Sequence, residues 1–431
     1  MMRLALMAAL GAAAILAVPA QAGARLIHAG TLLAKPGEAP LKEQTIVVEN
    51  GRIKEIRAGY SEPDSDESVV DLKAYFVLPG LIDSHVHLLG ELGPKQKVER
   101  VEDSPAALAL RGAYNARRTL AAGFTTVRDV GAPGGSGDAI FALRDAIAKG
   151  WVWGPRVYAS GSTISPTGGH AQTYGYRDDI LELFASDGVC DGAVRCREAV
   201  RRQVGRGANH IKLVATGGVL SDIAAGTGQQ FFDDEMRAIV EAAHRLGRRA
   251  TAHAHGADGI KAALRAGVDS IEHGTFMDDE AIALFKTRGA YYVPTVLAGM
   301  TVAEYAKTSD FMSPAVKAKS LAVGPQILET LRRAHKAGVK IAFGTDTGVS
   351  RHGDNAREFV LMVEAGMTPM ETIRAATVAA ADHLGVATDI GTIEPGKIAD
   401  IVAVAENPLD NVSALTRMRF VMKDGAVFKR D

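Results

Sequence analysis

The chain has 431 residues, a formal charge of −1 and 47% hydrophobic residues. This length allows one large folded domain with a smaller one beside it. The near-neutral charge argues against a nucleic-acid partner and against binding to an anionic membrane, because both need a strongly basic surface.

The first 22 residues differ in composition from the rest of the chain. Arg3 supplies a positive start, residues 4–18 are apolar and rich in alanine, and Ala20-Gln21-Ala22 has the small-residue pattern of a cleavage site. The apolar run is shorter than the roughly 20 residues that span a bilayer. We therefore expect a signal peptide at residues 1–22 and an exported protein, periplasmic or secreted, with no stable membrane contact after cleavage. The alternative is an uncleaved membrane anchor.

Both ends of the remaining chain are expected to form short strands. Asn50-Gly51 is typical of a tight hairpin turn. Neither end is long enough to make a stable sheet by itself, so the two ends are expected to combine. The sequence predicts one composite β-sandwich from residues 23–77 and 390–431, with candidate strands at 25–30, 45–53, 68–72, 399–404 and 420–428.

The central segment, residues 78–389, is predicted to alternate short strands with helices. Several apolar stretches rich in β-branched residues have the length of one strand, and a helix-like stretch usually follows each of them. This alternation is typical of a parallel sheet with helices outside it. The sequence therefore predicts an α/β protein whose central part is a (β/α)₈ TIM-like barrel.

Some of these strands carry side chains that could bind metal ions. Active sites of such barrels lie at the carboxyl ends of the strands, so these side chains are expected to meet there. Imidazole and carboxylate are ligands that zinc favours in hydrolytic sites. The candidate metal ligands are His85, His87, Lys212, His253, His273 and Asp346.

Two of these candidates need a chemical explanation. His85 and His87 end an apolar run, and because alternate side chains of a strand share a face, both can hold one ion. Lys212 is unusual, since an ammonium group repels a cation. In an apolar strand, however, the charged form of lysine is disfavoured, and the neutral amine can take up carbon dioxide to become a carbamate. A carbamate has two oxygens and could bridge two metals.

These residues stand in motifs that resemble the amidohydrolase superfamily, in its binuclear form with a carboxylated lysine. The resemblance covers nearly the whole chain after residue 24, with five motifs in family order. They are Leu78-Pro79-Gly80-Leu81-Ile82-Asp83-Ser84-His85-Val86-His87, His253-Ala254-His255-Gly256, Ile271-Glu272-His273-Gly274, Gly344-Thr345-Asp346-Thr347 and Gly391-Thr392-Ile393-Glu394-Pro395-Gly396-Lys397-Ile398-Ala399-Asp400.

The resemblance implies a role for each candidate ligand. It implies two zinc or other divalent ions per chain, the more buried one held by His85, His87 and Asp346. His253 and His273 would hold the second ion, with Lys212 as N6-carboxylysine bridging the two. Asp346 would also be catalytic, taking a proton from the metal-bridging hydroxide as it attacks a carbonyl and passing it to the leaving amine.

Two glycine-rich loops are expected to shape the substrate site. The loop at residues 165–174 carries His170, which we expect to act in catalysis by holding a substrate carbonyl or carboxylate. The loop at residues 216–231 carries Val219 and Leu220, which we expect to touch the substrate or to pack the loop. His255 shares the face of His253 and is expected to orient a ligand or contact the substrate. The other histidines considered, His28, His210, His244, His335 and His383, are interpreted as structural.

Cys190 and Cys196 lie in a turn that enters a predicted helix. Their spacing allows a local disulfide, which export to an oxidising compartment would favour. Neither lies at a strand end, so they are poor candidates for metal ligands. A pair of free thiols is the alternative.

Within the superfamily, the chain looks most like exported bacterial Xaa-dipeptidases and the amidohydrolases that cleave ochratoxin. This implies hydrolysis of an amide next to a free carboxylate, with release of a C-terminal amino acid from a dipeptide or N-acyl amino acid. The alternatives are a cyclic amidase, an imidazolonepropionase-like hydrolase or deaminase of a cyclic nitrogen compound, and a non-catalytic assembly protein. The resemblance also implies a small-molecule or dipeptide substrate and a homo-oligomer, possibly an octamer.

Overall fold

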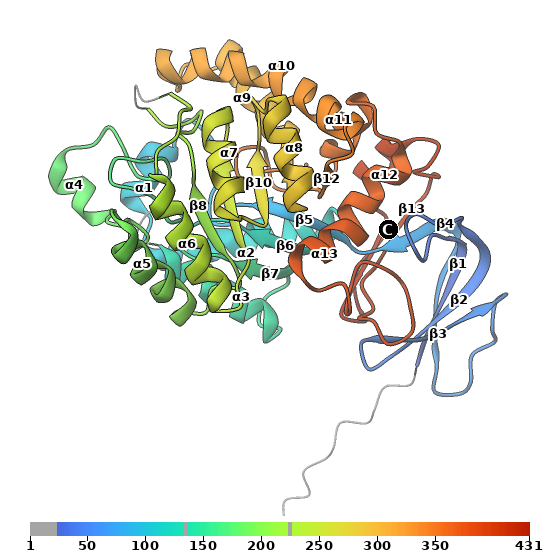
Figure 1. Ribbon diagram of the computed structural model, residues 1–431. Helices are drawn as coiled ribbons and strands as arrows, with labels where there is room; N and C mark the ends of the chain where they lie inside the picture. Colours follow the sequence, from blue (N-terminus) through green and yellow to red (C-terminus); the bar gives the residue numbers. More distant parts are fainter. Residues whose placement is uncertain (1–23, 133–135, 223–225) are drawn as a thin grey trace, which may run out of the picture.

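A computed structural model describes residues 24–132, 136–222 and 226–431 of the chain (Figure 1). The predicted signal peptide at residues 1–22 lies outside the described residues. None of the helices within the described ranges combines the length and the apolar character that a bilayer crossing requires.

The central part contains parallel strands in two hydrogen-bonded sheets, with the orders β5-β6-β7 and β12-β11-β10-β9-β8. Single bridges join the sheets at both junctions, between Ile164 and Leu213 and between Val86 and Thr347. The prediction of an α/β fold with parallel strands is confirmed. One continuous barrel ladder is not formed, because the segments at the junctions pair through single bridges. The strands are β5 (Leu81–Val86), β6 (Phe124–Asp129), β7 (Arg156–Ala159), β8 (Ile211–Val214), β9 (Ala250–Ala254), β10 (Ser270–His273), β11 (Tyr291–Val293) and β12 (Lys340–Ile341).

Helices cover the outer side of these strands, and α6, α7 and α8 follow one another along it (Figure 1). α7 shows why: Ile260, Ala263 and Leu264 recur at helical spacing and are buried, and Gly267 ends the helix in a left-handed conformation. The helices are α1 (Gln96–Glu102), α2 (Pro105–Ala121), α3 (Gly137–Ala148), α4 (Asp178–Leu183), α5 (Ala193–Gly205), α6 (Asp233–Arg245), α7 (Ala257–Ala266), α8 (Asp279–Arg288), α9 (Val296–Thr308), α10 (Pro314–Lys336), α11 (Arg357–Glu364), α12 (Pro369–Arg374), the π-helix η1 (Ala375–Ala379), α13 (Ala380–Leu384) and the 3₁₀ helix η2 (Val412–Thr416).

The two chain ends combine in one seven-stranded sheet with the order β15-β14-β13-β4-β1-β2-β3 (Figure 1). The sequence predicted one composite β-sandwich from the two chain ends. Their strands are joined in one hydrogen-bonded sheet because the long strand β4 pairs with β1 along most of its length and with β13 at its end. The strands are β1 (Arg25–Leu32), β2 (Leu41–Glu49), β3 (Arg52–Ala58), β4 (Ser68–Pro79), β13 (Ile401–Val404), β14 (Phe420–Lys423) and β15 (Ala426–Arg430).

Two tight turns lie against each other in this sheet. Asn50 and Gly51 both have positive φ angles between β2 and β3, as the predicted hairpin requires. The expected single strand at 420–428 is wrong, since Asp424 and Gly425 form a second turn with positive φ and divide it into β14 and β15. A Cβ atom added to Gly51 would lie 2.8 Å from the Asp424 carbonyl oxygen, so the first turn needs glycine for its contact as well as its conformation.

Candidate active site

A cavity of about 320 Å³ lies at the carboxyl ends of the parallel strands. β5 leads to His85 and His87, β8 carries Lys212, β9 carries His253, and β10 ends at His273. The structure brings together every residue that the sequence analysis assigned to metal or substrate. These residues are His85, His87, His170, Lys212, Val219, Leu220, His253, His255, His273 and Asp346.

His85 is held by a buried charged network. Its Nδ1 lies 2.7 Å from Glu272 Oε2, and because a carboxylate only accepts, the ring proton is on Nδ1. Arg128 Nη2 donates to Glu272 Oε1 at 2.7 Å, and the Thr251 and Ser270 hydroxyls donate to the same oxygen. Burial raises the pKa of the Glu272 carboxyl, but Arg128 and His85 outweigh it and bring the pKa well below its usual range. His85 Nε2, on the other side of the ring, faces Asp346.

Two further histidines have their ring protons fixed in the same way. His87 Nδ1 donates to the Gly131 carbonyl oxygen at 2.8 Å. His273 Nδ1 lies 2.8 Å from Thr295 Oγ1, which donates its own proton to the Pro294 carbonyl oxygen and therefore accepts from the ring. Burial lowers the pKa of the His273 ring well below its ordinary value, so its Nε2 is left as an acceptor. Burial also lowers the pKa of His87, but the hydrogen bond and charge of Asp346 outweigh it and raise that pKa above its ordinary value. A neutral imidazole with one nitrogen fixed by a hydrogen bond is the usual state of a metal-binding histidine.

Asp346 lies between the first two histidines. Its Oδ1 is 3.4 Å from His85 Nε2 and 3.2 Å from His87 Nε2. Burial raises the pKa of the Asp346 carboxyl, but both rings outweigh this and bring the pKa well below its usual range. His85 Nε2 and Asp346 Oδ1 are buried, and neither has a hydrogen-bond partner among the described residues. Unpartnered buried acceptors of this kind fit a bound cation.

Lys212 is almost fully buried, with 4% of its surface exposed, and it lines the same cavity. Burial lowers the pKa of its amine to about 8. Within residues 24–132, 136–222 and 226–431, no hydrogen bond or ion pair to this amine is found. A partly neutral, unpaired amine beside the histidines fits the predicted carbamate.

The rings of His253, His255 and His273 form one group. The His253 and His273 ring centres are 4.6 Å apart, and those of His255 and His273 are 4.9 Å apart. One nitrogen of each ring lies within 4.8 Å of the others, and His85, His273 and Asp346 form a second such group. Burial lowers the pKa of all three rings below the ordinary value, so they are neutral at pH 7. The structure thereby adds His255 to the possible ligands, although its Nδ1 also lies 2.8 Å from Thr275 Oγ1.

His170 reaches the cavity from the loop after β7. Its ring centre is 4.1 Å from that of His253, and its Nδ1 is 2.6 Å from Ser221 Oγ. Burial lowers the pKa of His170 to about 3, so the ring is neutral. A Cβ atom on Gly218 would collide with this ring, which explains why the facing loop carries glycine there.

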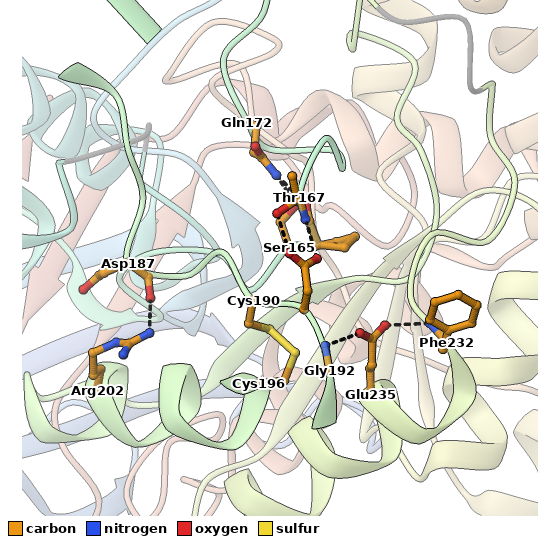
Figure 2. Close-up of a disulfide and its surroundings, with 12 residues drawn as sticks. Ser165, Thr167, Gln172, Asp187, Cys190, Gly192, Cys196, Arg202, Phe232 and Glu235 are labelled. Atoms are coloured by element: carbon orange, nitrogen blue, oxygen red, sulfur yellow. Dashed lines mark hydrogen bonds between the residues drawn. A yellow bond between two sulfur atoms is a disulfide. The ribbon is translucent and has the colours of Figure 1, made fainter. Parts of the chain in front are cut away.

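The disulfide between Cys190 and Cys196 supports the His170 loop (Figure 2). The Cys190 N–H donates to the Ser165 carbonyl oxygen at 3.0 Å, and Ser165 Oγ donates to the His170 carbonyl oxygen at 2.7 Å. Asp191, next to Cys190, accepts from the Thr167 N–H at 3.0 Å. The disulfide-closed turn thus forms the base on which the loop rests.

Four non-glycine residues that line the cavity have left-handed backbone conformations. They are Ala171, His273, Thr295 and Asp346, with φ of 73°, 70°, 53° and 55°. Each such conformation costs of order 1 kcal/mol, and such residues cluster at functional sites. At His273 the turn has a clear effect, because neighbours in a regular strand would point to opposite faces. Here both Glu272 and His273 approach the His85 ring.

Apolar side chains form one wall of the cavity. Val219 and Leu220 line it, as predicted, and Val219 also packs in a cluster with Val302 and Val323 from helices α9 and α10. Val219 therefore packs the loop against these helices while it lines the cavity.

Several site residues were not assigned from the sequence. Glu272 stands inside a quoted motif, but regular alternation gave no reason to place it beside His85. Arg128 donates to Glu272, which holds His85, and Thr295 accepts from His273, and no sequence pattern signals either hydrogen bond. Arg100 lines the cavity from α1, and only the packing of that short helix brings it there.

Comparison with known proteins assigns the family. The model of the amidohydrolase family matches residues 76–428. This chain belongs to the amidohydrolase family. It is 33% identical to the ochratoxinase of Aspergillus niger, over 96% of this chain and 88% of that protein.

Solved structures of amidohydrolases resemble it closely. A crystal structure of a Xaa-Pro dipeptidase with bound methionine in the active site has a TM-score of 0.88 and 42% identity, covering 94% of this chain and 100% of that one. The crystal structure of A. niger ochratoxinase has a TM-score of 0.81 and 31% identity, covering 95% of this chain and 96% of that one. The chain is thus an amidohydrolase-family hydrolase. The family is typically metal-dependent, and the histidine groups of this cavity could hold a metal ion.

Proposed function

We propose that this hydrolase cleaves the amide bond of a dipeptide or N-acyl amino acid and releases the C-terminal amino acid, with ochratoxin-type amides among its substrates. The observation that carries the proposal is the single cavity in which a histidine and carboxylate cluster faces a loop histidine and an apolar wall. The similarity to a dipeptidase and to an ochratoxinase supports the same bond type.

Two divalent ions, most simply zinc, are proposed as cofactors. His85, His87 and Asp346 would hold one ion, His253 and His273 the other, and Lys212 as N6-carboxylysine would bind both. Bound ions of this kind lower the pKa of water and polarise a carbonyl oxygen. The ligand residues supply two neutral rings to each ion, and Asp346 and the carbamate supply the negative charge.

Different residues of the chain then transfer the proton and bind the substrate. The Asp346 carboxylate takes a proton from the attacking water and passes it to the leaving nitrogen. Ser221 Oγ lies 2.6 Å from His170 Nδ1. In the tautomer in which this hydroxyl donates to Nδ1, His170 Nε2 carries a proton and donates to the substrate carbonyl oxygen. The apolar wall that includes Val219 and Leu220 excludes water and holds an apolar side chain of the substrate.

A substrate panel tests this function. Dipeptides, N-acyl amino acids, ochratoxin A and cyclic amides should be assayed with zinc and bicarbonate, and the released amino acid measured by chromatography. We expect turnover of the linear amides. Turnover of cyclic amides alone would overturn the proposal.

Two variants separate chemistry from binding. Asp346→Asn should remain folded while kcat falls roughly 100-fold or more, the scale of lost general-base help. His170→Ala should keep its metal content and circular dichroism spectrum while kcat/KM for linear amides drops. An Asp346→Asn variant with wild-type kcat would remove Asp346 from the proton path, and full activity in His170→Ala would remove His170 from substrate binding.

We further propose that the protein is exported and forms closed homo-oligomers. The disulfide supports export, since such bonds persist in oxidising compartments. Cell fractionation should find the protein outside the cytoplasm with its terminus at residue 23. Light scattering should give a multiple of the monomer mass, and a monomer mass would refute the assembly.

A further inference from the structure

Arg100 lies on α1 and lines the cavity, where its side chain is partly buried. Its Nη1 donates to Thr173 Oγ1 at 3.2 Å, on the loop that also carries His170. A guanidinium group has five N–H donors, so this one bond leaves most of its hydrogen-bonding capacity unused. Burial lowers the pKa of Arg100, which reflects the loss of water around the charge.

The acidic residues near Arg100 pair with other cations. Glu99 lies 3.3 Å from Arg111, and Asp103 pairs with the same arginine. Asp222, across the cavity mouth, lies 3.9 Å from Lys97. In the part of the chain that the structure describes, no carboxylate is within ion-pair distance of Arg100. A desolvated charge without a counter-ion is costly, which makes Arg100 a site for an anion that comes from outside the chain.

Three polar side chains of the adjoining loop are already engaged in hydrogen bonds. The Tyr174 hydroxyl donates to the Gly169 carbonyl oxygen, and the Tyr176 hydroxyl donates to the Lys97 carbonyl oxygen at 2.5 Å. Gln172 Nε2 donates to the Pro166 carbonyl oxygen. Lys97 itself is mostly exposed and therefore well solvated. Arg100 is left as the group on this wall that can form two parallel bonds to an anion.

We propose that Arg100 binds a carboxylate of the substrate and makes the enzyme selective for amides that carry one. This rests on the proposed function, because it names the part of the substrate that lies away from the scissile bond. The planar guanidinium matches a carboxylate with two N–H···O bonds, which neither a lysine nor a neutral side chain can reproduce. The carboxylate has two possible sources, the α-carboxylate of the released amino acid and an acidic side chain.

A binding experiment on the intact enzyme distinguishes these sources without turnover. Calorimetry should compare L-methionine and L-phenylalanine with their primary amides, and with the α-amides of aspartate and glutamate. Stronger binding of the free amino acids assigns the α-carboxylate, and stronger binding of the acidic amides assigns the side chain. Equal binding of L-methionine, L-phenylalanine and all the amides overturns the proposal.

Variants connect this preference to Arg100. Arg100→Met should weaken the preferred carboxylate ligand roughly 10- to 100-fold, the scale of a lost charged hydrogen-bond pair, and leave the neutral amides unchanged. Arg100→Lys should retain part of the preference, and Arg117→Met, at an exposed position on α2, is the matched control. A preference that survives in Arg100→Met, or a loss shared by Arg117→Met, overturns the proposal. Failure of the wild-type enzyme to cleave any linear amide would instead count against the proposed function.

Discussion

His210 and Lys212 lie two residues apart, the first directly before β8 and the second within it. Alternate side chains of an extended segment point to the same side, so the two share one face. Lys212 lines the cavity, whereas both ring nitrogens of His210 are buried without a hydrogen-bond partner in the described chain. Burial lowers the pKa of both groups. Burial therefore does not distinguish Lys212 from His210, while access to the cavity does.

A second difference concerns how the rings are held. The protons of His85 and His273 are fixed on Nδ1 by Glu272 and Thr295, but neither His210 nor His383 has such a partner among the described residues. From the sequence we interpret His210 and His383 as structural. Their lack of hydrogen-bond partners among the described residues agrees with that interpretation. Among these four buried rings, His85 and His273 line the cavity and have a hydrogen bond on one nitrogen, whereas in the described part of the chain His210 and His383 do neither.

The largest expected effect is at Lys212. Lys212→Ala should lower kcat/KM at least about 1,000-fold, because the loss of a shared ligand removes several kcal/mol of charge stabilisation. Elemental analysis should find less than two metal ions per chain, and short carboxylic acids should restore part of the activity. A fully active variant would show that Lys212, like His210, is needed for neither metal binding nor catalysis.

Glu272→Gln tests the fixed ring proton. The amide can no longer pair with Arg128, and it no longer requires the His85 proton to be on Nδ1, so metal affinity should fall about 10- to 100-fold. The free energy of unfolding should also fall by about 3–5 kcal/mol, since the Arg128 charge stays buried. Titration with a metal indicator and chemical denaturation measure the two effects. Unchanged metal affinity would show that orientation by Glu272 is not required.

The disulfide gives a smaller expected effect. Replacing Cys190 and Cys196 together by serine should lower the free energy of unfolding by about 2 kcal/mol, the loop-closure value for so short a loop. Because the closed turn supports Ser165 and through it His170, KM should rise while metal content stays constant. Wild-type treated with a mild reductant should behave like the variant. A wild-type KM in both the variant and the reduced enzyme would show that the disulfide-closed turn does not position the His170 loop.

The smallest effect is expected at His210. His210→Leu removes a buried polar ring that has no partner among the described residues, which is nearly neutral for stability when the shape is similar. Metal content and kcat should match wild type within experimental error. Loss of metal in this variant would show that His210, although it does not line the cavity, also supports the metal site.

The predicted ligands could be found from the sequence because each is a polar side chain at or near the end of an apolar strand. His85, His253 and Asp346 interrupt runs that burial would otherwise keep apolar, and parallel strands bring such ends together. The α/β class follows from the same alternation. Arg100 could not be found in this way, because its position depends on how a short helix packs over the cavity.

Other features depend on backbone conformation that the residue pattern does not specify. Alternation separates Glu272 from His273, and the positive φ of His273 brings both to His85. The Asp424-Gly425 turn carried the same signal as Asn50-Gly51, but it lay inside an apolar stretch that we interpreted as one strand. The joining of the two chain ends in one hydrogen-bonded sheet depends on the length of β4, which pairs with both β1 and β13.

The seven-stranded sheet also affects the order in which the chain can fold. β4 pairs with β13 at Phe76–Pro79, although more than 300 residues separate them, so a ribosome must make nearly the whole chain before this pairing can form. Contacts of such long sequence separation form slowly, because the loop between them must close first. Until then the edge of β4 stays unpaired, and the apolar cluster that includes Val77, Ile401 and Phe420 stays incomplete. This apolar cluster therefore stays exposed to solvent or to chaperones until the C-terminal strands have been synthesised.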